Sequence, residues 1–241
     1  MVIKNFGTVY LDGQPYFPGA ESNGRVISFG DTVSEKAIPF VKWKNLWVAG
    51  KAVCTKCSWL DLNDAGFRYG RPVRIDGAVY LCRSLKVGAK GKDSNEWDDI
   101  MYDLGEDDSV WHWRGTLFWG QELSESLVSC SEVRGGCDPL YRASMASSAR
   151  GINIGFRPVL EPMPPELHIS DSLIGTSLQV FGNKGKTVYG VLKEVNDYDL
   201  ILLEHGAKTP QEELEGWGIR TDDGHLIIDL GCIDYLAEDV I

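Results

Sequence analysis

The chain has 241 residues, 43% of them hydrophobic and 10% aromatic, which is enough for one large domain or two smaller ones with separate cores. No stretch approaches eighteen uninterrupted apolar residues, and the first residues lack the charged region, apolar core and cleavage site of a secretory signal. We therefore expect neither a membrane span nor a signal peptide. The net charge of −11 is uneven, because residues 166–241 contain fifteen acidic and five basic residues. Such a negative field disfavours nucleic acid as a partner of this part of the chain.

Alternating apolar and polar residues separated by turns predict a β-rich N-terminal half. Asp12-Gly13 separates the apolar runs 8–11 and 14–17, and Asp76-Gly77 lies within the alternating segment 73–81. An Asp-Gly pair between two such runs is typical of a tight hairpin turn. We therefore expect a β-hairpin at each position.

Two helices are predicted in the same half. Residues 95–104 have apolar side chains at i, i+3, i+4 and i+7, a pattern typical of an amphipathic helix. Ser94 or Asp93 is expected to cap this helix, and Gly105 to end it. A helix of two turns is expected over residues 58–66.

A proline-rich segment divides the chain. Residues 161–166 contain three prolines, so they form neither a helix nor a central strand, and residues 161–172 are predicted to be a stiff linker. Beyond it, five short strands in about seventy residues are typical of a small closed barrel. These strands are expected over residues 173–180, 185–195, 197–204, 225–230 and 232–236, with a polar insertion at 205–223.

Three motifs between residues 66 and 160 resemble one known family. Asn95-Glu96-Trp97 opens the predicted helix, residues 111–119 are rich in tryptophan, and Arg134-Gly135-Gly136 is followed by Gly155-Phe156-Arg157. This combination resembles the C-type-lectin-like fold of the formylglycine-generating (sulfatase-modifying) family, which includes the lectin-like binding proteins of phages and prophages. The resemblance implies an α+β, β-rich fold, with residues 1–160 forming a C-type-lectin-like domain that carries an N-terminal β-rich extension.

The enzyme chemistry of that family is not expected here. The resemblance implies two closely spaced cysteines after the Arg-Gly-Gly turn that bind copper, whereas in this chain only Cys137 follows the turn. One thiolate without a partner is a poor copper(I) site. The sequence therefore predicts a protein that is not this oxidase, and leaves open an enzyme with an unrecognised site.

Residues 173–241 resemble an Sm-like small β-barrel, through the run from Gly185 to Leu202. In that family an Asp and an Asn before the third strand, together with an Arg-Gly near the last strand, contact RNA. Asp197 matches the Asp, but Asp199 stands where the Asn is expected and Ala237-Glu238 where the Arg-Gly is expected. A carboxylate repels phosphate and cannot replace the amide. We therefore expect an acidic barrel used for oligomerisation or docking.

No metal or cofactor is expected. Cys54 and Cys57 form a Cys-x-x-Cys pair without a second pair, so packing thiols are favoured, with a zinc site or a redox pair as alternatives. The acidic residues Asp103 and 106–108 lack the spacing of a calcium loop. The six cysteines are expected to be free thiols, most of them structural.

Five residues are candidates for ligand binding: Trp111, Trp113, Trp119, Arg142 and Arg150. Tryptophans usually fill a core, and that interpretation stays open. The alternative is an exposed aromatic floor beside an arginine, able to stack a sugar or a base or to anchor a protein. The binding surface is expected on the loops between Phe118 and Arg150, where the Ser-rich residues 124–131 and the small residues 143–149 resemble variable binding loops.

The leading hypothesis is a non-catalytic, phage- or prophage-type binding protein, in the cytoplasm or in a virion. The lectin-like domain would present a surface to a protein or glycan, and the barrel would assemble a homo-oligomer. The alternative is an intracellular mobile-element inhibitor whose acidic domain mimics nucleic acid and blocks a host defence nuclease. Steeply salt-weakened binding to a basic partner would distinguish the inhibitor from the lectin-like protein.

Overall fold

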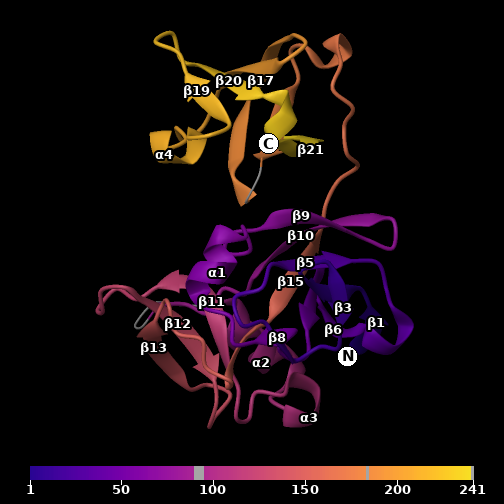
Figure 1. Ribbon diagram of the computed structural model, residues 1–241, viewed down its shortest axis with the longest axis vertical. Coiled ribbons are helices and arrows are strands. Elements are labelled where there is room, and N and C mark those ends of the chain that lie inside the picture. The colour runs from indigo at the N-terminus through magenta and orange to yellow at the C-terminus, as the bar shows by residue number, and fades with distance from the viewer. Residues whose placement is uncertain (90–94, 183–184, 240–241) are drawn as a thin grey trace. The chain divides into compact units, whose positions relative to one another are not determined.

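A computed structural model describes residues 1–89, 95–182 and 185–239 of the protein. It is β-rich, with 46% strand, 14% helix and four sheets, which agrees with the expected β-rich α+β class. The chain forms two compact units, Met1–Pro162 and Met163–Ile241 (Figure 1). In the described part of the chain, no helix has the length and apolarity needed to cross a membrane.

The largest antiparallel sheet of the N-terminal unit joins both ends of that unit. Its strand order is β1-β6-β7-β15-β10-β9. The strands are β1 (Val2–Phe6), β6 (Ile38–Trp43), β7 (Leu46–Ala49), β15 (Pro158–Pro162), β10 (Ala78–Ser84) and β9 (Arg71–Ile75). Because β15 lies between β7 and β10, the last strand of the unit fills the centre of the sheet and closes the fold.

Two further sheets complete the N-terminal unit. One has the order β13-β12-β11-β14-β8-β4, and the other the order β3-β2-β5. The first contains β13 (Arg142–Ala146), β12 (Cys130–Gly135), β11 (Leu117–Leu123), β14 (Ile154–Phe156), β8 (Cys54–Thr55) and β4 (Ala20–Glu21). The second contains β3 (Gln14–Tyr16), β2 (Thr8–Leu11) and β5 (Ile27–Gly30). The small-residue run that resembled a variable loop is therefore largely strand, because β13 pairs with β12.

Both predicted hairpins are confirmed. β2 pairs with β3 and β9 with β10, each across an Asp-Gly turn. Asp12 and Gly13 have φ values of 50° and 73°, and Asp76 and Gly77 have 50° and 78°. Positive φ at both central residues is the requirement of the type I′ turn, which Asp-Gly meets at low cost.

Both predicted helices are present. α1 (Trp59–Asp64) begins with a capping box, in which the Ser58 hydroxyl accepts from the Asp61 N–H and the Asp61 carboxylate accepts from the Ser58 N–H. α2 (Glu96–Leu104) ends at Gly105, as expected. The N-cap of α2 is Asn95, and the expected caps Ser94 and Asp93 lie outside the described residues.

The remaining helical segments are short. α3 (Asp108–Trp111) was not predicted, and Asp107 caps it by accepting from the Ser109 N–H at 2.9 Å. α4 (Gln211–Leu214) lies in the C-terminal unit. Single 3₁₀ turns cover Ser34–Lys36, Asp171–Leu173 and Leu230–Cys232.

The Arg-Gly-Gly and Gly-Phe-Arg motifs both place an arginine in the core. Gly135 and Gly136 have φ values of 93° and 89°, and a Cβ at Gly135 would lie 2.7 Å from the Thr116 carbonyl oxygen, so only glycine fits this turn. The Arg157 guanidinium lies 3.7 Å from the Phe118 ring centroid and donates to the Trp111 carbonyl. Burial lowers the pKa of Arg157 to about 9, so it remains protonated at pH 7.

Over residues 163–182 and 185–239, the C-terminal unit forms one sheet of six strands, whereas a closed barrel of five strands was predicted. Its order is β19-β20-β18-β17-β16-β21, and it is open. The strands are β16 (Ser177–Gly182), β17 (Thr187–Val195), β18 (Asp199–Glu204), β19 (Gly218–Arg220), β20 (His225–Asp229) and β21 (Ile233–Glu238). The extra strand β19 comes from the predicted polar insertion, and the neighbouring Trp217 is buried in the core of this unit.

Loss of the α1 cap tests this account of the N-terminal unit. Ser58→Ala removes the hydroxyl that accepts from the Asp61 N–H at 3.1 Å, and it should lower the free energy of unfolding by about 0.5–2 kcal/mol. Denaturant unfolding followed by tryptophan fluorescence reports mainly on this unit, because seven of the eight tryptophans precede residue 162. Ser58→Thr keeps a capping hydroxyl and should restore most of the loss. Equal stability of Ser58→Ala and the wild type would contradict the assignment.

Candidate ligand-binding groove

The three candidate tryptophans are core residues. Trp111 and Trp119 are fully buried and Trp113 is nearly so. The indole N–H groups donate to backbone carbonyls at 2.8–2.9 Å: that of Trp111 to Gly105, that of Trp113 to Glu106 and that of Trp119 to Cys57. The expected exposed aromatic floor is therefore not formed, because these rings and their polar atoms are already used inside the protein.

The two candidate arginines lie in different places. Arg150 is half exposed, and its Nε and Nη2 donate to both carboxylate oxygens of Asp61 on α1, at 2.8 and 2.5 Å. Arg142, at the start of β13, donates to the Ala89 carbonyl at 3.4 Å and to Asp98 on α2 at 2.5 Å. Arg150 is thus explained by an ion pair with α1, whereas Arg142 leads to a larger polar cluster.

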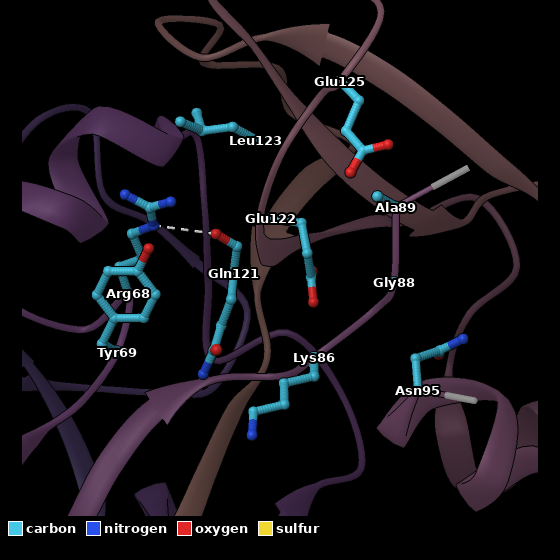
Figure 2. A pocket seen from close by; sticks show the side chains of 10 residues that line it. All are labelled: Arg68, Tyr69, Lys86, Gly88, Ala89, Asn95, Gln121, Glu122, Leu123 and Glu125. Carbon is cyan, nitrogen blue, oxygen red and sulfur yellow. Dashed lines mark hydrogen bonds between the residues drawn. The ribbon is translucent and has the colours of Figure 1, made fainter. Parts of the chain in front are cut away.

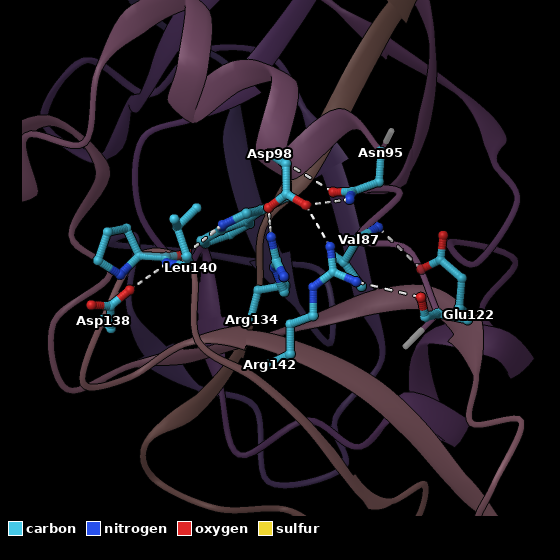
Figure 3. A network of polar contacts seen from close by, with 11 residues as sticks. Val87, Asn95, Asp98, Glu122, Arg134, Asp138, Leu140 and Arg142 are labelled. Carbon is cyan, nitrogen blue, oxygen red and sulfur yellow. Dashed lines mark hydrogen bonds and ion pairs between the residues drawn. The ribbon is translucent and has the colours of Figure 1, made fainter. Parts of the chain in front are cut away.

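Asp98 is the centre of that cluster, which Figure 3 shows. Its carboxylate contacts Arg142 and also the buried guanidinium of Arg134, the arginine of the Arg-Gly-Gly motif. Asn95 binds the same residue twice: its side-chain oxygen accepts from the Asp98 N–H at 3.0 Å, and its Nδ2 donates to Oδ2 at 2.6 Å. One carboxylate therefore fixes α2 against β12 and β13.

A groove opens beside this cluster, and we call it the Arg68 groove (Figure 2). Its volume is about 500 Å³. Among the described residues, four segments distant in sequence form it: the turn after α1, the segment after β10, the N-cap of α2, and the end of β11 together with Glu125. The lining residues are Arg68, Tyr69, Lys86, Gly88, Ala89, Asn95, Gln121, Glu122, Leu123 and Glu125.

Arg68 is held by stacking and by one hydrogen bond. Its guanidinium lies 4.5 Å from the Trp59 ring centroid and 4.3 Å from that of Tyr69. Its Nε donates to the Gln121 carbonyl oxygen at 3.0 Å. Burial lowers the pKa of Arg68. A guanidinium held in this way is a pre-organised donor for a polar ligand.

The opposite wall is fixed by hydrogen bonds to the segment that follows β10. The Glu122 carboxylate accepts from the Val87 N–H at 3.1 Å, and Glu96 accepts from the Lys86 N–H at 2.9 Å. The Gln121 side chain donates to the Ser84 carbonyl at 2.9 Å. These bonds fix the segment after β10 against β11 and α2.

The groove has charges of both signs. Arg68 and Lys86 are positive, whereas Glu122 and Glu125 are negative. Tyr69 is 60% exposed and Leu123 46% exposed. Balanced charge beside an exposed aromatic ring suits a polar, uncharged or zwitterionic ligand better than a polyanion.

A second pocket, the Arg142 pocket, has a volume of about 390 Å³. The Arg142 pocket is lined by Asp98, Met101, Tyr102, Glu106, Arg134, Leu140 and Arg142. Arg142 also donates to the carbonyl of Ala89, which lines the Arg68 groove.

The cysteines and the acidic loop have structural partners. Cys54 and Cys57 are buried and free, and the hydrogen bond between them together with burial raises the pKa of Cys54. Asp103 accepts from the Trp43 indole at 2.8 Å, and Asp108 accepts from the Arg114 N–H at 2.7 Å. In the described ranges, no three His, Cys, Asp or Glu side chains are grouped so that they could hold a metal ion.

Sequence reasoning placed the binding surface between residues 118 and 150, and part of the groove, from Gln121 to Glu125, does come from that range. It missed Arg68, Tyr69 and Lys86, which no motif marks.

The chain matches no protein-family model, no curated protein and no solved structure. The groove is therefore interpreted from its own chemistry.

Removal of the Asp98 carboxylate should destabilise the N-terminal unit. Asp98→Ala leaves Arg134, which is 1% exposed, without its counter-charge, and we expect a loss of about 3 kcal/mol in the free energy of unfolding. Asp99→Ala, one residue further along α2, is the matched control and should cost less than about 0.5 kcal/mol. Denaturant unfolding measures both. Similar losses in the two variants would refute the role of Asp98.

The contribution of the Arg150–Asp61 ion pair to the free energy of unfolding should depend on pH. The hydrogen bond from Arg150 lowers the pKa of Asp61, so this pair stabilises the protein at pH 7 and its contribution is lost as the pH falls through that lowered pKa. Arg150→Ala should cost about 0.5–1 kcal/mol at pH 7, because the pair is partly exposed. The difference from wild type should shrink below about pH 4. A difference that is constant from pH 7 to pH 3, measured by urea unfolding, would contradict this explanation.

Proposed function

We propose that the protein is a non-catalytic binding protein, and that its N-terminal unit holds a glycan or a segment of another protein in the Arg68 groove. The observation that carries this proposal is the fixed guanidinium of Arg68, placed between two aromatic rings in an open cavity of about 500 Å³. Polar donors beside an exposed aromatic ring can bind the hydroxyl groups of a sugar or the backbone of a peptide.

The lining of the groove favours binding over catalysis. Among the described residues that line it, none is a histidine, cysteine or serine, the residue types that most often act as a nucleophile or general base. The Glu122 carboxylate is engaged by the Val87 N–H, and Arg68 by the rings and the Gln121 carbonyl. These groups are suited to orienting a ligand.

The lectin-like resemblance supports the same proposal. It rests on the Arg-Gly-Gly and Gly-Phe-Arg motifs, whose arginines are buried beside the α2 helix and the tryptophan-rich segment. In the setting that we propose, a phage or prophage protein, this unit would present the groove to a surface ligand. The C-terminal unit would assemble copies of the chain, for which its edge strand β19 is suited.

The charge of the C-terminal unit favours a second candidate function. Its fifteen acidic and five basic residues give a net charge of −10 in the last third of the chain. Such a surface could occupy the nucleic-acid site of a basic enzyme, as an inhibitor from a mobile element would.

Substitution of Tyr69 tests the groove directly. Tyr69→Ala removes a ring that is 60% exposed, so it should leave the fold intact and weaken binding at least about tenfold on arrays of defined oligosaccharides and of short peptides. Lys86→Ala should weaken binding of the same ligands. Tyr198→Ala, which removes an exposed ring from the other unit, is the control and should bind as the wild type does. Ligands that bind Tyr69→Ala and Lys86→Ala unchanged would place the site elsewhere.

A further inference from the structure

The C-terminal unit contains a cavity of its own, which we call the His205 pocket. It has a volume of about 700 Å³. Tyr189 lines it from β17, His205 and Lys208 from the segment after β18, Glu213 from α4, and Asp239 from the end of β21. This pocket belongs to a different unit from the Arg68 groove, so inferences about it do not depend on the function proposed above.

The wall of the His205 pocket is fixed in place. Glu204 pairs with Arg220 at 2.8 Å and also accepts from the Thr209 N–H at 2.7 Å. Arg220 in turn donates to the Thr209 carbonyl at 2.6 Å. The segment between His205 and Thr209 is therefore tied at both ends, and the pocket is pre-formed.

A serine, a histidine and an aspartate meet at this pocket, but not as an acyl-transfer triad. His205 Nε2 lies 2.6 Å from the Ser177 hydroxyl and 3.4 Å from the Asp239 carboxylate. In a catalytic triad the serine and the carboxylate bind opposite ring nitrogens, so that one nitrogen is free to take the serine proton. Here both lie nearest the same nitrogen, so the three residues do not have the arrangement of a triad, and Asp239 lies beside the His205 ring.

The remaining polar groups make the pocket negative. Asp239 and Glu213 are carboxylates, and among the described lining residues Lys208 is the one lysine or arginine. Burial and then the nearby Asp239 raise the pKa of Tyr189, as expected where a further negative charge is unfavourable. The net charge of −10 on this part of the chain adds to the same potential.

We propose that the His205 pocket binds an organic cation, a primary ammonium or a guanidinium group, with Asp239 and Glu213 as counter-charges. The ring of Tyr189, which is 39% exposed, supplies a face on which such a cation can rest, while its hydroxyl accepts from Gln179 at 2.7 Å. The cation is either a free amine or a lysine or arginine side chain of a partner protein.

Isothermal titration of the full chain tests this site with matched probes. Butylamine and butylguanidine should bind, whereas butanol, which has the same length without the charge, should not. The pentapeptide acetyl-Gly-Gly-Lys-Gly-Gly-amide distinguishes a free amine from a side chain of a partner protein. If the pentapeptide binds at least about tenfold more tightly than butylamine, the site is assigned to a protein side chain. If it binds equally or more weakly, the site is assigned to a free amine.

Two variants and one control locate the cation. Asp239→Asn and Glu213→Gln should each weaken butylguanidine binding about tenfold. Glu212→Gln, on the same helix and with the same loss of charge, should leave binding unchanged, because Glu212 does not line the pocket. Glu213 is exposed, so its variant keeps the test valid if Asp239→Asn fails to fold. Binding of butanol as tight as that of butylamine, or equal losses in Glu212→Gln and Glu213→Gln, would overturn the proposal.

Discussion

The carboxylate of Asp98 contacts two guanidinium groups at once, one buried on β12 and one at the start of β13, and thereby ties α2 to that sheet. A buried arginine is costly unless a counter-charge accompanies it. The position of α2 therefore follows from the need to neutralise Arg134. Because Asn95 caps α2 and binds the same carboxylate, that contact also sets one wall of the Arg68 groove.

The other walls of the groove likewise depend on hydrogen bonds and ion pairs that satisfy polar groups inside a tryptophan-rich core. The Trp59 indole donates to the Gly120 carbonyl at 3.0 Å, and its ring supports Arg68. Glu96 forms an ion pair with Arg83 at 2.6 Å while it accepts from the Lys86 N–H. Core residues thus position the residues that line a surface groove.

Local patterns predicted local structure well. The Asp-Gly turns and the apolar spacing of residues 95–104 identify their elements because backbone preference and burial act over a few neighbours. The three residues of β19 are too short for any periodicity, so the sixth strand was missed. The high number of tryptophans did not indicate whether their side chains are buried or exposed. Arg68, Tyr69 and Lys86 were missed because only the tertiary fold brings them together.

The central claim is that one groove in the N-terminal unit receives the ligand. Amide chemical-shift mapping of the full chain, titrated with the tightest ligand from the oligosaccharide and peptide arrays, tests it most directly. The account predicts that the largest shifts fall on the residues that line the groove, which are Arg68, Tyr69, Lys86, Gly88, Ala89, Asn95, Gln121, Glu122, Leu123 and Glu125. Largest shifts in the C-terminal unit, or spread evenly over the chain, would contradict it.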